Sequence, residues 1–178
     1  MDFTVSSAIS EGIPIEGIEK KTGMKLEELF LPSLAIFDLN GSTKEEIIQE
    51  MGNLMKEREV VSSGFTESVL EREMLSSTFI GYHSAIPHAD PRYVKKPVIA
   101  YTRLKNMILW DGHLVRHVFM LALPEDGQEI VSKFYRMLVS DGFEDEMEQL
   151  ESGQQLLELI RNRTMEFNVF KEVKDEGV

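Results

Sequence analysis

Cysteine is absent from this chain of 178 residues. Its absence excludes disulfides, a thiol nucleophile and metal sites built on thiolates. Long apolar runs are missing as well. Residues 1–5 lack the basic segment and apolar stretch of a signal peptide, and the later apolar stretches are too short to span a bilayer. We therefore expect a cytoplasmic protein that does not insert into membranes.

Positive charge is also scarce. The chain has 19 lysines and arginines against 31 acidic residues, which gives a formal net charge of -12. A negative field of this size repels phosphate backbones, so we expect no direct nucleic-acid contact by this domain. The chain can nevertheless form a hydrophobic core, because 42% of its residues are apolar. Its length fits one domain, or one domain with a short appendage.

The sequence pattern becomes regular at Pro32. Before it, residues 1–31 carry only the pattern of a short helix over 16–30, and we interpret them as an N-terminal extension or the remnant of a linker. The regular part covers 32–163 and is predicted to be the folded domain. Residues 164–178 are then expected to form a C-terminal tail.

Strands and helices alternate along the regular part. Strand-like apolar runs occupy 33–39, 79–80, 85–86, 97–104 and 117–123, and helical spacing occupies 42–58, 66–74, 130–138, 143–150 and the segment after Ser152. The first helix is predicted to begin at a capping box of Ser42 and Glu45, and the last at a cap by Ser152. The final strand is apolar on both faces, as expected for a strand covered by helices on both sides. The order of elements predicts an α/β fold with a central sheet.

Among the histidines, His88 has the sequence neighbours that best fit a chemical role. The four histidines are His83, His88, His113 and His117. His88 follows Pro87 and precedes Pro91, so it lies on a stiff stretch of backbone. A phosphoryl-accepting histidine needs one deprotonated, exposed ring nitrogen and a second nitrogen that is held in place. Rigidity lowers the entropic cost of an in-line approach. From these residues alone, a loop histidine without chemistry remains the plainer interpretation.

Several segments together carry a resemblance to a known family. They are Val69-Leu70-Glu71-Arg72-Glu73, Ser77-Thr78-Phe79-Ile80-Gly81, Ala85-Ile86-Pro87-His88-Ala89, Val94-Lys95-Lys96-Pro97 and the strand 118–124. With these segments the chain resembles, over about 29–163, the enzyme IIA domain of the mannitol/fructose class of the bacterial phosphoenolpyruvate-dependent sugar phosphotransferase system. The resemblance implies an α/β fold with a central mixed β-sheet flanked by helices on both faces.

The resemblance also implies a function for His88. It would accept a phosphoryl group from the phosphohistidine of the carrier HPr and pass it to a cysteine of enzyme IIB, with no metal or cofactor. Arg72 matches the family arginine beside the active histidine, and a guanidinium can bind phosphoryl oxygens in bidentate fashion. Ser77 and Thr78 either offer hydroxyls to the phosphoryl group or serve a turn or strand. His83 either neighbours His88 or ends a strand.

One departure from the family concerns a second histidine. Family members with sugar-linked flux have one near the start of the helix after the strand 118–123, whereas this chain has no histidine in 125–129. Gln128 could donate a hydrogen bond there, but it cannot share a proton as an imidazole does. The segments 108–110, 115–119 and 134–135 resemble enzyme IIA-like domains at the C-terminal end of phosphotransferase-regulated transcription regulators.

Three interpretations therefore stay open. The chain is a phosphoryl carrier in sugar uptake, a regulatory module linked covalently to regulator domains, or an α/β binding domain without the chemistry. Whether it counts as an enzyme depends on the choice among them. A metal site at His113, His117 and Asp111 is the less favoured interpretation of those residues, because two histidines without a well-placed third ligand are mostly structural.

Overall fold

A computed structural model describes residues 23–175 of the chain, apart from the side chains of 170 and 172–175. Most of the helix predicted over 16–30 lies outside these residues, and the described part contains the short 3-10 helix η1, Leu26–Leu29. The helices are α2 (Lys44–Glu57), α3 (Phe65–Leu75), α4 (Gln128–Leu138), α5 (Phe143–Glu148) and α6 (Gly153–Asp175), with η2 (Pro32–Leu34) and η3 (Pro91–Tyr93) as further 3-10 turns. No helix in this part of the chain is long and apolar enough to cross a membrane.

The strands form one five-stranded mixed sheet in the order β1-β4-β5-β3-β2. The strands are β1 (Ala35–Leu39), β2 (Phe79–Gly81), β3 (Ser84–Ala85), β4 (Val98–Trp110) and β5 (His113–Ala122). β1 runs parallel to β4, and β3 runs parallel to β5. The pairs β4–β5 and β2–β3 are antiparallel. The predicted mixed sheet is confirmed.

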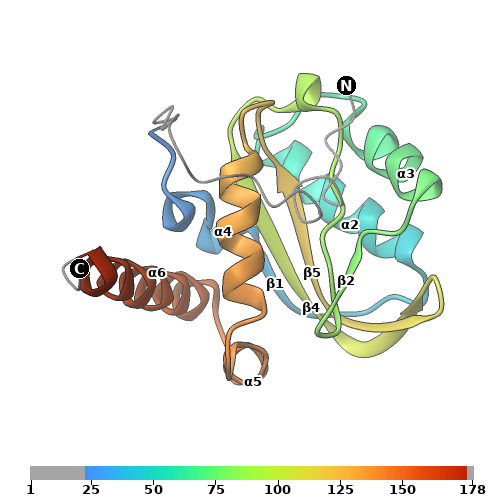
Figure 1. Cartoon of the computed structure of the whole chain (residues 1–178). Helices are drawn as coiled ribbons and strands as arrows, with labels where there is room; N and C mark the ends of the chain where they lie inside the picture. The colour runs from blue at the N-terminus through green and yellow to red at the C-terminus, as the bar shows by residue number, and fades with distance from the viewer. Residues whose placement is uncertain (1–22, 176–178) are drawn as a thin grey trace.

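Helices cover both faces of this sheet (Figure 1), as predicted. α2 and α3 lie on one side, and α4, α5 and α6 lie on the other. β5 supplies side chains to both cores: Phe119 and Leu121 belong to the α4 side, whereas Val118 and Met120 belong to the α2 side. Full burial of one such side chain stabilises the fold by roughly 1.5–3 kcal/mol. The strand that is apolar on both faces therefore holds the layers together.

β4 and β5 form a longer hairpin than the sequence predicts. The prediction ended the first strand at 104 and began the second at 117, but pairing continues out to Trp110 and His113. Asp111 and Gly112 make the turn, with φ angles of 49° and 87°. Such left-handed residues are typical of the tightest hairpin turns. The prediction was wrong there because exposed residues interrupt the apolar pattern near the turn.

The cap of α2 lies one residue later than predicted. Thr43 is the N-cap, and its hydroxyl accepts the Glu46 amide at 3.2 Å. The Glu46 carboxylate in turn accepts the Ser42 amide at 2.7 Å. The sequence Ser42-Thr43-Lys44-Glu45-Glu46 contains two overlapping capping patterns, and the structure uses the second. Ser152 caps α6 as predicted, since its hydroxyl accepts the Gln155 amide at 3.2 Å.

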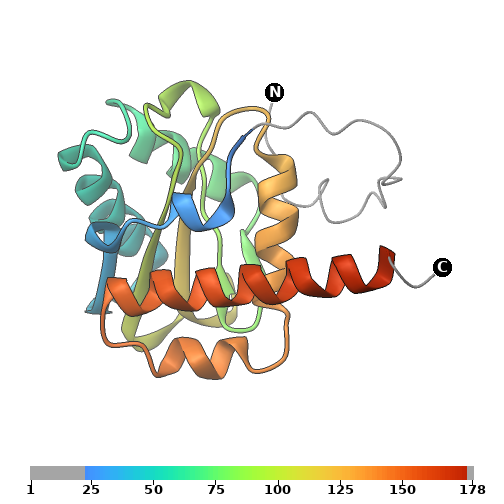
Figure 2. The ribbon, with the colours of Figure 1, turned by 90° about the vertical axis from the view of Figure 1, so that its left-hand side faces the viewer.

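The N-terminal segment of the described chain and the first half of α6 pack against the same side of the domain. Leu26, Leu29 and Phe30 are buried in the core on the α4 side, although they precede the predicted start of the domain at residue 32. α6 continues through residue 163 to Asp175, and its C-terminal end extends past α4 (Figure 2). The two segments touch closely, because a Cβ atom on Gly153 would lie 2.3 Å from the Pro32 carbonyl oxygen.

Candidate functional site

His88 lies on the segment that follows β3 and runs beside β5. It forms an isolated parallel bridge with Leu121, whose amide donates to the Pro87 carbonyl at 2.9 Å. The Ile86 amide donates to the Thr78 carbonyl at 3.1 Å. Pro87 fixes its own φ angle and has no amide to pair. Hydrogen bonds on both sides of the proline therefore place His88 against the sheet.

The ring of His88 is oriented by its own backbone. Nδ1 lies 3.0 Å from the Ile86 carbonyl oxygen. A carbonyl oxygen only accepts, so Nδ1 of the neutral ring carries the proton and Nε2 carries the lone pair. The residue is 3% exposed, so the exposed ring nitrogen expected of a phosphoryl acceptor is not seen, although His88 lines a cavity. In this tautomer the lone pair lies on the ring nitrogen that is farther from the Ile86 carbonyl.

His88 and Arg72 line the same cavity, which has a volume of about 290 Å³. One wall comes from α3, and the other from the segment after β3 and from η3. The lining residues are Ser68, Glu71, Arg72, Leu75, His88, Ala89, Asp90, Arg92 and Tyr93. The cavity is about ten times as large as the ~30 Å³ that one water molecule occupies in the liquid, which leaves room for a phosphoryl group. The structure thus brings together the two residues that the sequence motif singled out.

Arg72 is held at the C-terminal end of α3. Its Nη1 donates to the carbonyl oxygen of Ser76, the C-cap residue, at 2.9 Å. This bond satisfies one of the carbonyls that a helix end leaves without a partner. Its Nε is buried and makes no hydrogen bond within the described structure. Arg72 lines the cavity, so the charge of its guanidinium can act on an anion there.

An ion pair lies at the rim of the cavity. The Asp90 carboxylate accepts the Arg92 amide and the Arg92 guanidinium, both at 3.0 Å. The hydrogen bond from the Arg92 side chain holds the pKa of Asp90 below its usual range, and the same contact raises the pKa of Arg92. The Asp90 amide in turn lies 3.1 Å from the Ser68 hydroxyl, to which it donates. These bonds tie the segment after His88 to α3.

The hydroxyls of Ser77 and Thr78 are used elsewhere. Neither residue lines the cavity. The Thr78 hydroxyl donates to Glu73 at 2.6 Å, and the Ser77 hydroxyl accepts the Phe79 amide at 3.2 Å. Both residues thus have a turn role in this structure. The sequence analysis names Glu73 within a motif but gives it no role, although its position four residues after Val69 puts both on one face of the predicted helix.

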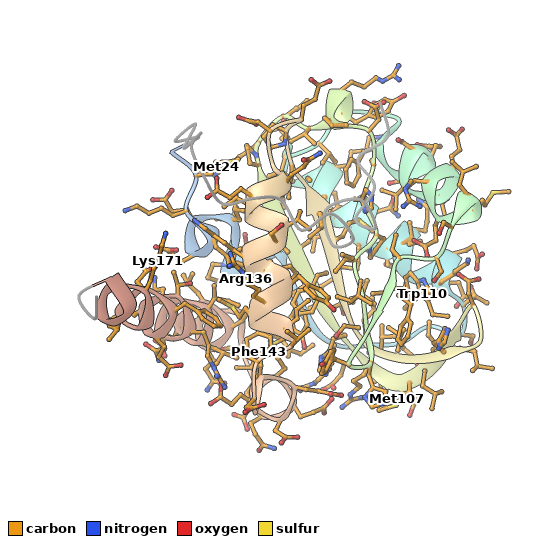
Figure 3. The ribbon with its side chains drawn as sticks, viewed as in Figure 1. Met24, Met107, Trp110, Arg136, Phe143 and Lys171 are labelled. Carbon is orange, nitrogen blue, oxygen red and sulfur yellow. The ribbon has the colours of Figure 1, made fainter. Side chains whose placement is uncertain are left out.

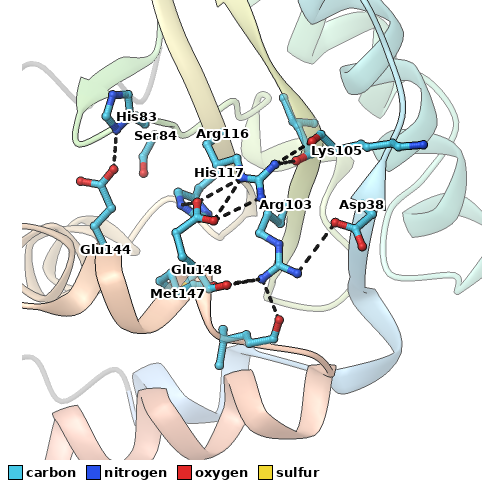
Figure 4. A network of polar contacts seen from close by, with 12 residues as sticks. Asp38, His83, Ser84, Arg103, Lys105, Arg116, His117, Glu144, Met147 and Glu148 are labelled. Carbon is cyan, nitrogen blue, oxygen red and sulfur yellow. Dashed lines mark hydrogen bonds and ion pairs between the residues drawn. The ribbon is translucent and has the colours of Figure 1, made fainter.

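His83 and Gln128 also lie outside the cavity lining. Nδ1 of His83 contacts the Glu144 carboxylate of α5 (Figure 4). Its carbonyl accepts the amide of His117, four residues before Leu121, which corresponds to about 13 Å along β5. His83 therefore belongs to another end of the sheet. Gln128 is the exposed first residue of α4, and its carbonyl accepts the Ser132 hydroxyl.

A buried polar cluster surrounds His117 beneath α5 (Figure 4). His117 is 1% exposed, and its Nδ1 lies 2.8 Å from the Tyr101 hydroxyl. Nε2 lies 3.1 Å from a Glu148 oxygen but outside hydrogen-bond geometry, so the contact is an ion-pair distance only. Burial lowers the pKa of His117 to about 4 and raises that of Tyr101. Burial alone would raise the pKa of Glu148, but the hydrogen bond from Arg116 and the nearby charges lower it overall.

Arg103 fastens the end of α5 to the sheet. Its Nη1 donates to the carbonyl oxygens of Met147, Glu148 and Leu150 at 3.3, 3.0 and 2.7 Å.

His113 and Asp111, which the sequence analysis considered as metal ligands together with His117, each have another partner. His113 stacks on Phe79 with 4.3 Å between ring centroids, and Asp111 pairs with Lys44 at 2.7 Å. No group of three or more potential metal ligands occurs among residues 23–175.

Comparison with known proteins gives one family match. The family model described as "Phosphoenolpyruvate-dependent sugar phosphotransferase system, EIIA 2" matches residues 28–163. The mannitol-specific phosphotransferase enzyme IIA component of Halalkalibacterium halodurans is 28% identical over 126 residues, which are 66% of this chain and 84% of that protein. The transcriptional regulator ManR of Bacillus subtilis is 28% identical over 107 residues. These are 60% of this chain but only 16% of the regulator, so the chain spans a small part of that relative.

A solved structure shares the fold. It is the Escherichia coli complex of enzyme IIAMTL with phosphorylated enzyme IIBMTL. The match has a TM-score of 0.66 and 19% identity, and it covers 73% of this chain and 95% of that one. At this level of identity the likeness concerns the fold.

Proposed function

Because this chain belongs to the enzyme IIA family of the phosphoenolpyruvate-dependent sugar phosphotransferase system, we propose that His88 accepts a phosphoryl group from phospho-HPr in the cytoplasm and passes it to an enzyme IIB. The observation that carries the proposal is the shared cavity of His88 and Arg72, with Nδ1 of His88 held by the Ile86 carbonyl. A relative of the same fold was solved with phosphorylated enzyme IIB, which supports the choice of acceptor.

The transfer needs only side chains of the two proteins. The lone pair on Nε2 of His88 forms the new N–P bond while the P–N bond of the donor phosphohistidine breaks, and that electron pair returns to the donor ring. The Ile86 carbonyl accepts a hydrogen bond from Nδ1–H throughout, and it stabilises the positive charge on the phosphorylated ring. In the second step a thiolate of enzyme IIB takes the phosphoryl group, and His88 regains its lone pair.

Arg72 supplies the electrostatic part of this mechanism. Charge spreads over the equatorial oxygens of a phosphoryl group in flight, and a positioned guanidinium stabilises it. Arg72 lines the same cavity as His88, so its guanidinium is suited to this task. The Ser76 carbonyl fixes the guanidinium at its other edge, which reduces the reorganisation needed during the reaction.

A second candidate function is regulatory. Gln128 lies where the family resemblance places a second histidine, and it cannot share a proton. The similarity to ManR associates the domain with a transcriptional regulator as well as with transport components. In that role the chain would be linked covalently to regulator domains. Phosphorylation of His88 would then change domain contacts, with little onward transfer to enzyme IIB.

Phosphorylation with phosphoenolpyruvate, enzyme I and HPr tests the proposal. We expect acid-labile label on the wild type and on the control variant His83→Ala, and none on His88→Ala. Label retained on His88→Ala would refute the assignment. Adding enzyme IIB to the labelled protein distinguishes a phosphoryl carrier from a regulatory domain. A carrier passes its label to enzyme IIB, whereas a regulatory domain keeps it.

A further inference from the structure

Glu73 is a buried carboxylate that the mechanism above does not use. It is 3% exposed and lies on α3 directly after Arg72. Its Oε1 accepts the Thr78 amide at 2.9 Å and the Trp110 indole at 2.7 Å, and its Oε2 accepts the Thr78 hydroxyl at 2.6 Å. Burying a carboxylate is costly unless its hydrogen bonds are made, and an apolar side chain would fill this position without that cost.

The bonds of Glu73 converge on Thr78. Two of the three come from this single residue, one from its backbone and one from its side chain. The third comes from Trp110, the last residue of β4, on the side of the sheet that carries α2 and α3 (Figure 3). The carboxylate therefore fastens the turn after α3 both to the helix and to the long hairpin.

Thr78 is connected to both residues of the proposed site. Two positions before it, the Ser76 carbonyl accepts Nη1 of Arg72 at 2.9 Å. On the other side, the Thr78 carbonyl accepts the Ile86 amide at 3.1 Å. The Ile86 carbonyl then holds Nδ1 of His88 at 3.0 Å. Thr78 therefore lies two residues from the carbonyl that holds the guanidinium and is hydrogen-bonded to the residue that holds the imidazole.

We propose that Glu73 is a positioning residue for phosphoryl transfer, because its carboxylate fixes Thr78 and thereby sets Arg72 and His88 relative to each other. The inference rests on the proposed function of His88. Misplacing reacting groups by about 1 Å can slow an enzymatic step by up to about 100-fold. A purely structural role for Glu73 would instead affect the stability of the fold and leave the rate of the folded protein unchanged.

Thr78→Val tests the proposal in the full chain. The change keeps the shape of the side chain and removes the hydroxyl that donates to Glu73. Thr102→Val is the matched control, because Thr102 is 0% exposed and its hydroxyl donates to the Ile36 carbonyl, outside the cavity lining. Initial rates of phosphorylation are measured against phospho-HPr concentration, well below the melting temperature of each variant. We expect kcat to fall about tenfold in Thr78→Val with KM unchanged, and no change in Thr102→Val.

Two further variants make the test specific to positioning. Thr78→Ser keeps the hydroxyl and is expected to restore most of the rate. In an Arg72→Ala background, Thr78→Val is expected to slow transfer by no more than about threefold, because part of its effect acts through Arg72. If Thr78→Val does not fold, Trp110→Phe removes another donor to Glu73 and is expected to slow transfer in the same way.

The outcomes separate this inference from the proposed function. A wild type that takes no label from phospho-HPr would overturn both. A labelled wild type with Thr78→Val at wild-type kcat would overturn only the role of Glu73. The role of Glu73 would also be overturned if Thr78→Val slowed transfer tenfold both in the wild type and in Arg72→Ala, because Thr78 and Arg72 would then act independently.

Discussion

The burial of His117 predicts a loss of stability in mild acid. Its ring contacts the Tyr101 hydroxyl and lies beneath α5, and burial lowers its pKa from 6.5 to about 4. The surrounding charges act in both directions, since Glu148 and Glu144 favour the protonated ring and Arg116 and Arg103 oppose it. The folded protein therefore holds a neutral imidazole over a pH range in which the unfolded chain binds a proton.

The size and sign of the effect follow from this difference. A change from 6.5 to about 4 corresponds to about 3 kcal/mol, at about 1.36 kcal/mol for each pKa unit. Above pH 6.5 the ring is neutral in both states, and His117 contributes no pH dependence. As the pH falls from 6.5 to about 4, only the unfolded chain takes up the proton, so the free energy of unfolding decreases. Below about 4 this contribution becomes constant.

Urea unfolding at a series of pH values measures the effect. The chain has one tryptophan, Trp110, which is fully buried and reports unfolding by its fluorescence. We expect His117→Gln to lose most of the slope of unfolding free energy between pH 6.5 and 4.5. His113→Gln is the control, because His113 is exposed and stacks on Phe79, and it should retain the wild-type slope. Equal slopes in the two variants would refute the reasoning.

Three further changes have expected outcomes. Arg72→Ala should slow labelling by phospho-HPr between tenfold and 100-fold, which corresponds to about 1.4–3 kcal/mol of transition-state stabilisation, and an unchanged rate would remove Arg72 from the site. Gly153→Ala would place a Cβ atom 2.3 Å from the Pro32 carbonyl and should lower the unfolding free energy by about 1–3 kcal/mol in urea titration; a neutral result would mean that the two segments separate easily. Thr43→Ala removes the cap of α2 and should cost about 1 kcal/mol in the same measurement, whereas Ser42→Ala should cost less.

The arrangement of layers could be predicted because it depends on patterns that the sequence displays directly. The run around Val118 and Phe119 is apolar on both faces, which requires helices on both sides of the sheet. The extent of the hairpin could not be predicted in the same way. Leu109 and Leu114 pair with each other near its turn and are apolar although exposed, so the sequence shows no alternation of apolar and polar residues there, even though burial alternates in the structure.

The two halves of the candidate site differ in how far the sequence predicts them. His88 and Arg72 were singled out by a motif, and the structure places them on one cavity. Thr78 lies between them in a chain of hydrogen bonds: its carbonyl accepts the Ile86 amide, and its hydroxyl donates to the Glu73 carboxylate. Such contacts arise only when strand and helix are packed together. Local patterns therefore point to reactive groups more readily than to the residues that hold them.

The anchoring of α5 by Arg103 has a consequence for variation in this region. Arg103 donates to the carbonyl oxygens of Met147, Glu148 and Leu150, and every amino acid offers that same group at these positions. The attachment itself therefore does not depend on which side chains stand at these positions, whereas lysine in place of Arg103 would lack the planar guanidinium. Met147 and Leu150 are buried in the core and Glu148 pairs with Arg116, so packing and charge, more than this attachment, limit variation there.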